Sequence, residues 1–195
     1  MLEIFYRDKG TGQISVSQSV GAFDGLRLED VLWIDLFAPT GDEKRGAEDF
    51  VGTVIQSRAQ AEEIESSSRF SESESAIYVN TNFLIPGPEE YSMETVSFML
   101  TKNILVTLRE CPLRSFTDLQ RRITAFPKMY QNGFIVFGSI LEQRIDLDAD
   151  MIELMSKEIE QYSRKVSLGE DINEEFLLDI NQLQENTMLV RENIV

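Results

Sequence analysis

Hydrophobic and polar residues follow two different periods along this chain, and the change comes near residue 130. Before that point, short runs rich in β-branched and aromatic residues are separated by glycine-containing turns, which is typical of β-strands. The predicted strands cover 2–7, 13–17, 31–36 and 76–85. Because helix-like segments lie between and after these strands, we predict an α/β fold.

The stretch ETVSFMLTKNILVTLRE, residues 94–110, predicts two strands that fold back through Lys102 and Asn103. In that register the facing pairs are Leu100 with Leu105, Phe98 with Thr107, Met99 with Val106 and Ser97 with Leu108. Both faces of the hairpin are therefore largely apolar. A sheet that is apolar on both faces must be covered on both faces.

Two helices are expected in this part of the chain. Thr40 and Glu43 fit a capping box at the start of the first helix, because a hydroxyl and a carboxylate three residues apart can satisfy free amides there. Ser115 is expected to cap the second helix, which Pro127 should end. The apolar stripes are Phe50, Val51, Val54 and Ile55 in the first helix and Leu119, Ile123 and Phe126 in the second.

From Phe134 onward, apolar residues recur at spacings of three, four and seven, which predicts two long helices over 134–166 and 172–195. We therefore predict two domains, an α/β domain over 1–130 and a helical hairpin over 131–195. The hairpin is expected to be antiparallel and to pack through Ile145, Ile152, Ile159, Ile180, Leu183 and Val190. The second helix reaches the last residue without a stop signal, so we expect it to be cut there.

Composition limits the possible chemistry. The chain has 34 acidic and 18 basic residues, a formal net charge of -16, no histidine and a single cysteine, Cys111. This charge repels phosphate backbones, so we expect no nucleic-acid partner. Without histidine, imidazole catalysis and the usual structural zinc sites are excluded, and any metal ion must be held by oxygen. We predict no enzymatic activity, because no nucleotide-binding or nucleophile motif occurs.

Acidic residues gather at 62–65, in the serine-rich stretch 66–75 and in the segment 142–153. The spacing of Glu142, Asp146 and Glu153 would keep three carboxylates on one side of a helix, where they could share Mg²⁺ through water. A solvated helix face would show the same pattern. The charged start of the chain is unlike a signal peptide, and no apolar run reaches the roughly 18 residues of a membrane span. The given chain is therefore expected to be soluble and cytoplasmic.

Taken in order, several segments resemble the cytoplasmic domain of the CorA-type divalent-cation transporters. They are WIDL with Pro39 and Glu43 after it, AEEIESSSRFSESESAIYVNTNF at 61–83, the hairpin at 94–110, and GFIVFGSILEQRIDLDADMIELMSKEIE from Gly133. The resemblance covers nearly all 195 residues. It implies an α/β/α sandwich with a largely antiparallel or mixed central sheet, followed by a long antiparallel helical hairpin.

The resemblance also implies a homopentamer at the cytoplasmic face of the inner membrane, joined to the membrane only through C-terminal helices that this sequence lacks. The Gly-Met-Asn pore signature of the family is absent. Family members respond to divalent ions held by carboxylates between neighbouring subunits, and the matching positions here are Glu62, Glu63 and Glu142. The regulatory ligand would be Mg²⁺, or Co²⁺ or another divalent cation.

Two alternatives remain open at this point. A zinc-transporting relative shares the same architecture, and the ion that permeates is selected in the missing pore. A stand-alone protein-binding module could instead present its heptad helix to a partner, since a seam that ends at the terminus is equally typical of a dimerisation helix.

Overall fold

Two compact units make up the computed structural model of this chain. The sheet unit comprises Met1–Thr81 and Thr95–Glu142, and the hairpin unit comprises Asn82–Glu94 and Gln143–Val195. The structure describes residues 1–56, 70–88, 90–169 and 173–194. The predicted division into domains at 1–130 and 131–195 stays a prediction.

The strands of the described ranges form one seven-stranded mixed sheet in the order β2-β1-β3-β7-β6-β5-β4. Their bounds are β1 Leu2–Arg7, β2 Ile14–Ser17, β3 Val31–Phe37, β4 Phe70–Glu72, β5 Ile77–Ile85, β6 Ser92–Thr101 and β7 Ile104–Arg109. Strand β3 pairs in parallel with β7, whereas β1 pairs antiparallel with both β2 and β3. The predicted strands are confirmed, and β4 is a short addition from the serine-rich stretch.

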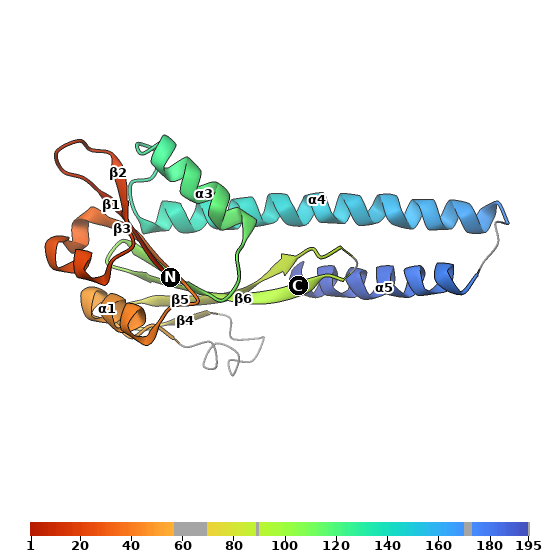
Figure 1. Cartoon of the computed structure of the whole chain (residues 1–195), viewed down its shortest axis with the longest axis horizontal. Helices are drawn as coiled ribbons and strands as arrows, with labels where there is room; N and C mark the ends of the chain where they lie inside the picture. Colours follow the sequence, from red (N-terminus) through yellow and green to blue (C-terminus); the bar gives the residue numbers. More distant parts are fainter. Residues whose placement is uncertain (57–69, 89, 170–172, 195) are drawn as a thin grey trace. The chain divides into compact units, whose positions relative to one another are not determined.

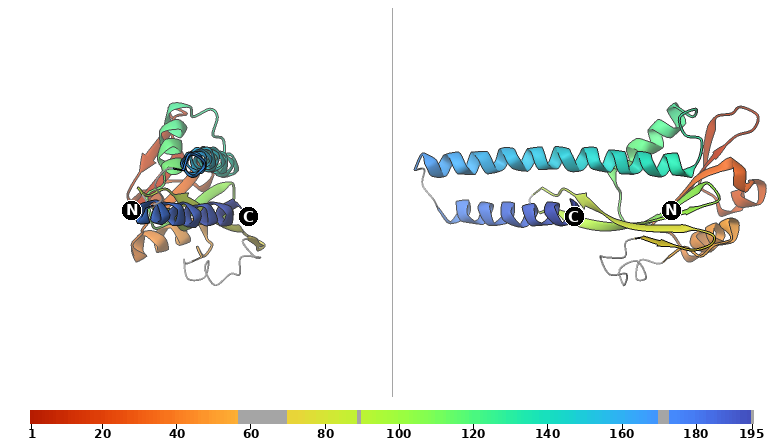
Figure 2. Two further views of the ribbon diagram at one scale, coloured as in Figure 1. Left: turned by 90° about the vertical axis from the view of Figure 1, so that its right-hand side faces the viewer. Right: turned by 180° about the vertical axis from the view of Figure 1, so that it is seen from behind.

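The α-helices that the described ranges contain are α1 Gly41–Val51, α3 Arg114–Ala125, α4 Gly133–Ser167 and α5 Glu174–Ile194. Two short 3₁₀ helices, η1 Val20–Gly25 and η2 Leu28–Asp30, lie between β2 and β3. In the sheet unit, α1 lies on one face of the sheet and α3 on the other (Figures 1 and 2). The predicted α/β/α sandwich is therefore confirmed.

The β6–β7 hairpin has the predicted register, because Leu100 pairs with Leu105 and Met99 with Val106. Lys102 and Asn103 both have positive φ, which the tight two-residue turn requires. On one face, Met99 and Val106 belong to a core cluster with Ala47 and Val51 of α1. On the other face, the Phe98 ring lies 6.3 Å from Phe116 of α3 and 5.2 Å from Phe137 of α4. Both apolar faces are covered, as the sequence required.

A buried charged network joins β3 and β7 on the α3 side of the sheet. The guanidinium of Arg109 pairs with both carboxylate oxygens of Asp35, at 2.8 Å for the closest contact. Thr107 donates to Asp35 at 2.7 Å and accepts from the Trp33 indole at 2.9 Å. The Arg109 guanidinium also lies over the rings of Phe37 and Phe116. A buried pair needs such additional partners, because desolvating two charges is costly.

The predicted capping box at the start of α1 is confirmed. The Thr40 hydroxyl accepts from the Glu43 amide, and the Glu43 carboxylate accepts from the Thr40 amide at 2.8 Å. The same carboxylate also accepts from the Leu2 amide and pairs with the amino group of Met1 at 3.1 Å. Burial acts to raise the pKa of Glu43, but these hydrogen bonds and the Met1 charge outweigh it, so the pKa is lowered.

Three predictions about helix ends and faces in the sheet unit are wrong. Helix α3 starts after Leu113 without a side-chain cap, and Ser115 is buried inside its first turn rather than capping it. Phe126 follows the end of α3 and is exposed. Helix α1 ends at Val51 because Gly52 adopts the left-handed conformation of a C-cap, so Val54 lies outside the helix and is exposed.

In the hairpin unit, α4 and α5 lie side by side (Figures 1 and 2). Their shared core consists of Leu84, Met151, Met155, Leu183 and Val190. Leu183 and Val190 are thus confirmed as packing residues. The predicted seam of α4 is wrong, because Ile145, Ile152 and Ile159 are 64%, 42% and 47% exposed. Successive residues are about 100° apart around a helix, so neighbours in the sequence point in different directions. On α4, Met151 and Met155 face the core, and the isoleucines do not.

Candidate functional site

The three predicted metal ligands lie in two different situations. Glu62 and Glu63 lie outside the described residues. Glu142 lies on α4 at the end of the sheet unit, and its side chain is exposed to solvent. An exposed carboxylate can still accept a metal ion or a metal-bound water, but Mg²⁺ prefers six oxygen ligands in an octahedron, so Glu142 would supply only a small part of that set.

The other acidic residues of the predicted face also lie on α4. Asp146 and Glu153 are exposed. The Glu153 carboxylate pairs with the Lys157 ammonium at 2.6 Å, and this hydrogen bond and charge lower the pKa of Glu153 and raise that of Lys157. Within the ranges that the structure describes, no three acidic or cysteine side chains come close enough to form a metal site. A divalent site that uses Glu142 therefore needs ligands from elsewhere.

A polar cluster that the sequence did not predict joins α4 to α5 in the hairpin unit. Arg144 donates to the backbone carbonyl of Asn193 at 2.8 Å, and its guanidinium lies 3.4 Å from the Asp148 carboxylate. The Asn193 amide donates to Asp148 at 3.0 Å. Burial raises the pKa of Asp148, while Arg144 and Asn193 act against that rise.

A second buried asparagine lies seven residues earlier on α5. The Asn186 side-chain oxygen accepts from the backbone amide of Tyr91 at 3.0 Å, which ties α5 to the segment between β5 and β6. Burial raises the pKa of Tyr91, and the nearby Glu158 carboxylate adds to this. The sequence feature that could have revealed these contacts is the spacing of seven between Asn186 and Asn193, because polar residues at seam positions specify how helices pair.

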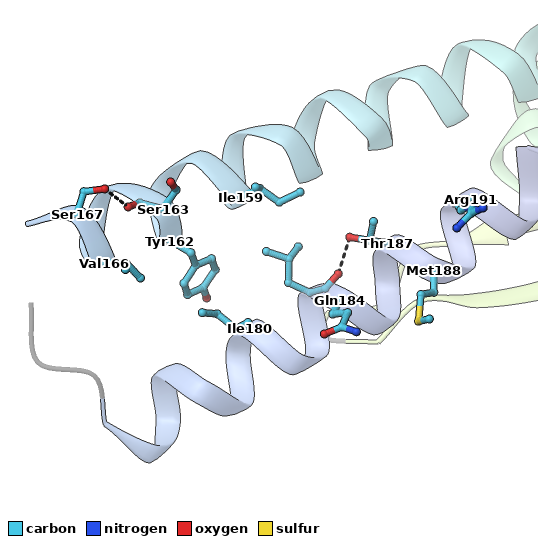
Figure 3. Close-up of a pocket in the computed structure, with 11 residues that line it drawn as sticks. Ile159, Tyr162, Ser163, Val166, Ser167, Ile180, Gln184, Thr187, Met188 and Arg191 are labelled. Atoms are coloured by element: carbon cyan, nitrogen blue, oxygen red, sulfur yellow. Dashed lines mark hydrogen bonds between the residues drawn. The ribbon is translucent and has the colours of Figure 1, made fainter. Parts of the chain in front are cut away.

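The hairpin unit also has an open and largely apolar groove. This groove of about 540 Å³ runs between α4 and α5 (Figure 3). The Tyr162 hydroxyl donates to Asp179 at 3.1 Å, and the Tyr162 ring meets Phe176 edge-on at 5.5 Å. The groove is lined by Ile159, Tyr162, Ser163, Val166, Ser167, Ile180, Leu183, Gln184, Thr187, Met188 and Arg191.

No helix within the described ranges has both the length and the apolar character needed to cross a bilayer. The arrangement as a whole is an α/β/α sheet unit combined with an acidic helix pair that presents carboxylates to solvent. Carboxylate oxygens are the ligands that hard divalent cations prefer.

Two solved structures share the fold of this chain. The soluble domain of CorA from Methanocaldococcus jannaschii matches 95% of this chain with a TM-score of 0.72 at 14% identity, and the match covers 71% of that chain. The cytoplasmic domain of ZntB from Vibrio parahaemolyticus matches 98% of this chain with a TM-score of 0.54 at 16% identity, and the match covers 80% of that chain. At such identities the likeness shows the fold alone.

Sequence comparison identifies the family. The family model described as CorA-like Mg2+ transporter protein matches residues 29–195, and the chain belongs to this family. The magnesium transport protein CorA of Wolinella succinogenes is 34% identical over 170 residues, which cover 85% of this chain and 53% of that protein. The corresponding protein of Campylobacter jejuni is 32% identical over 177 residues, covering 85% of this chain and 54% of that protein. The chain thus spans about half the length of the curated relatives it matches.

Proposed function

We propose that this chain is the cytoplasmic, metal-sensing domain of a transporter that carries Mg²⁺, and with it Co²⁺, across the inner membrane. Membership of the CorA-like family carries this proposal, because the curated relatives are magnesium transport proteins about twice as long as the matched region. The full-length protein is proposed to form a homopentamer, with its membrane segments in the part of the protein that this sequence does not include.

The sensing role is proposed to rest on Glu62, Glu63 and Glu142, shared with a neighbouring subunit. The exposed position of Glu142 supports this, since a ligand between subunits must be open to solvent in one copy. The net charge of -16 supports it as well, because assembled copies repel one another until cations bind between them. At ten times the dissociation constant, bound Mg²⁺ would stabilise the assembled state by about 1.4 kcal/mol per site.

Two alternatives, zinc transport and a stand-alone binding module, can be distinguished from magnesium transport by experiment. Zinc transport has the support of the ZntB cytoplasmic domain, but that likeness concerns the fold alone. A stand-alone binding module is favoured only by the open groove between α4 and α5. Uptake of Mg²⁺, Co²⁺ and Zn²⁺ by cells that produce the full-length gene product distinguishes all three. We expect Mg²⁺ uptake, and an absence of uptake of any divalent ion contradicts the transporter assignment.

The sensor site is tested separately, by protection of the cytoplasmic domain from protease during a Mg²⁺ titration of the full-length protein. Glu63→Gln and Glu142→Gln should each move the protection midpoint to about tenfold higher Mg²⁺, because each removes one charged ligand. Glu160→Gln on the same helix removes an equal charge outside the site and should leave the midpoint in place. If neither Glu63→Gln nor Glu142→Gln moves it, the site assignment fails while the uptake result still stands.

A further inference from the structure

A second cavity, of about 390 Å³, lies in the sheet unit between the β1–β2 strands and helix α3. It is remote in sequence from the predicted metal ligands. It is lined by Glu3, Phe5, Val16, Gln18, Thr117, Gln120, Arg121 and Thr124. Its volume is within the range of pockets that hold small ligands, which runs from roughly 300 to 1,000 Å³.

The carboxylate of Glu3 is held in this pocket by two side-chain amides. Gln18 donates to one carboxylate oxygen at 3.0 Å, and Gln120 donates to the other at 2.5 Å. The Gln120 amide also reaches Asp35 at 3.3 Å, which connects the pocket to the buried charged network. A carboxylate offers about four acceptor positions, so Glu3 can accept further hydrogen bonds.

Of the two carboxylates that Gln120 contacts, Asp35 has a cationic partner and Glu3 has none among the described residues. Arg109 neutralises Asp35 through close contacts with both of its oxygens. Glu3 forms no ion pair with any residue of the described ranges. Arg121, which is cationic and lines the pocket, lies 3.9 Å from the Asp118 carboxylate instead. A half-buried carboxylate, fixed by two neutral donors and without a cation, favours a positively charged ligand.

We propose that this pocket binds a guanidinium or alkylammonium group through the Glu3 carboxylate. The N–H donors of such a group would take the free acceptor positions of Glu3, and its aliphatic stem would lie against Phe5 and Val16. The ligand is either a free small organic cation or the side chain of an arginine or lysine from another polypeptide. This inference is independent of metal transport and of the proposed sensor site.

Calorimetric titration of the 195-residue chain tests the proposal with three probes. Agmatine represents a free organic cation, and N-acetyl-arginine amide represents a side chain of a polypeptide. Tetramethylammonium carries the same charge without N–H donors, so it measures only attraction to the net negative charge. We expect agmatine or the arginine derivative to bind about tenfold more tightly than tetramethylammonium, and the stronger of the two identifies the source.

Glu3→Gln should remove this preference, because it keeps the shape of the side chain and removes its charge. Glu175→Gln, on the exposed surface of α5, changes the net charge equally and should preserve it. Side-chain amide signals of Gln18 and Gln120 should shift in nuclear magnetic resonance spectra when agmatine is added. Equal binding of all three probes, or a preference that Glu3→Gln leaves intact, would overturn the proposal.

A second variant keeps the test valid if Glu3→Gln unfolds the chain. Val16 lines the pocket from β2 and is partly exposed, so Val16→Lys places a tethered ammonium group beside Glu3. We expect Val16→Lys to lower agmatine affinity at least about tenfold by occupying the site. Unchanged agmatine binding in a folded Val16→Lys chain would likewise overturn the proposal.

Discussion

Apolar residues in similarly regular patterns are buried to different extents in the sheet unit and in the hairpin unit. In the sheet unit, Ile34 and Val106 at predicted strand positions are fully buried beneath helix α1. In the hairpin unit, Ile145 and Ile159 occupy predicted seam positions, yet about half or more of each side chain is exposed. The same residue type in a regular pattern is buried in one unit and exposed in the other.

The difference arises from how each element presents its side chains. Side chains of a strand alternate between two faces, and a tight turn fixes the register of the pairing. Together these two features decide which residues are buried. A helix has a broad apolar arc, and only the part that meets a partner is buried. In α4 the buried part contains Met151 and Met155, together with Arg144 and Asp148 at the polar cluster. The exposed isoleucines lie farther around the same helix.

The largest effect is expected at the buried pair of the sheet unit. Arg109→Met leaves the Asp35 carboxylate buried without its cation, and removing one partner of a buried pair costs about 3–5 kcal/mol. Urea unfolding followed by circular dichroism measures this loss of stability. We expect the double variant Asp35→Leu/Arg109→Met to recover much of it, because no uncompensated charge remains. A loss below about 1 kcal/mol for Arg109→Met would show that water reaches Asp35.

Much of the sheet unit could be predicted from the sequence, since local rules decide it. The capping box at Thr40 and the register around Lys102 and Asn103 involve neighbours in the chain. The Asp35–Arg109 pair could not be predicted, because it depends on β3 and β7 lying side by side although 74 residues separate the two partners. A strand sequence such as WIDL shows one polar residue but not its partner.

The packing of the hairpin and the candidate metal site could be predicted less well from the sequence, because they too depend on residues that are distant in the chain. Helical periodicity predicted two helices but not which part of the α4 arc meets α5, and the polar cluster at Asn193 contributes to that choice. Glu62 and Glu63 lie outside the described residues, so their relation to Glu142 rests on the family resemblance. In a site between identical subunits the ligands come from different copies, so one sequence contains all of them but does not show which of them meet.

An intermediate effect is expected for two adjacent residues of α4 that differ in burial. Met155 is 4% exposed in the hairpin core, whereas Leu154 is 50% exposed. Met155→Ala should lower the free energy of unfolding by about 2–4 kcal/mol, because it leaves a cavity in the core. Leu154→Ala should change it by less than about 0.5 kcal/mol, as is typical of surface positions. Thermal unfolding of both variants under the same conditions makes the comparison.

Ile152→Asp sharpens the same comparison. A predicted seam position would bury the new charge and lose several kcal/mol, whereas the 42% exposure of Ile152 predicts a loss of about 0.5–1 kcal/mol. A loss larger than that of Met155→Ala would mean that Ile152 is covered in solution, for example by another copy of the chain.

The smallest effect concerns the pH dependence of the polar cluster. Burial raises the pKa of Asp148 above its ordinary value of 3.8, so the folded chain holds this proton more tightly than the unfolded chain. The stabilisation of the folded state that comes from this tighter proton binding is fully present at low pH. It is lost as the pH rises through the raised pKa. The stability of the wild type relative to Asp148→Asn should therefore fall as the pH rises above 3.8 and then become constant.

Glu153→Gln provides the control with the opposite sign. The hydrogen bond and charge of Lys157 lower the pKa of Glu153 below 4.5, so its contribution to stability appears as the pH rises towards 4.5. Wild-type stability relative to Glu153→Gln should therefore rise with pH up to about 4.5, whereas its stability relative to Asp148→Asn should fall above 3.8. Both differences come from urea unfolding between about pH 3 and pH 7, where carboxylates titrate. If both rise together, attraction to Arg144 outweighs burial at Asp148, and the Arg144–Asp148 pair of α4 resembles a solvated ion pair rather than a desolvated one.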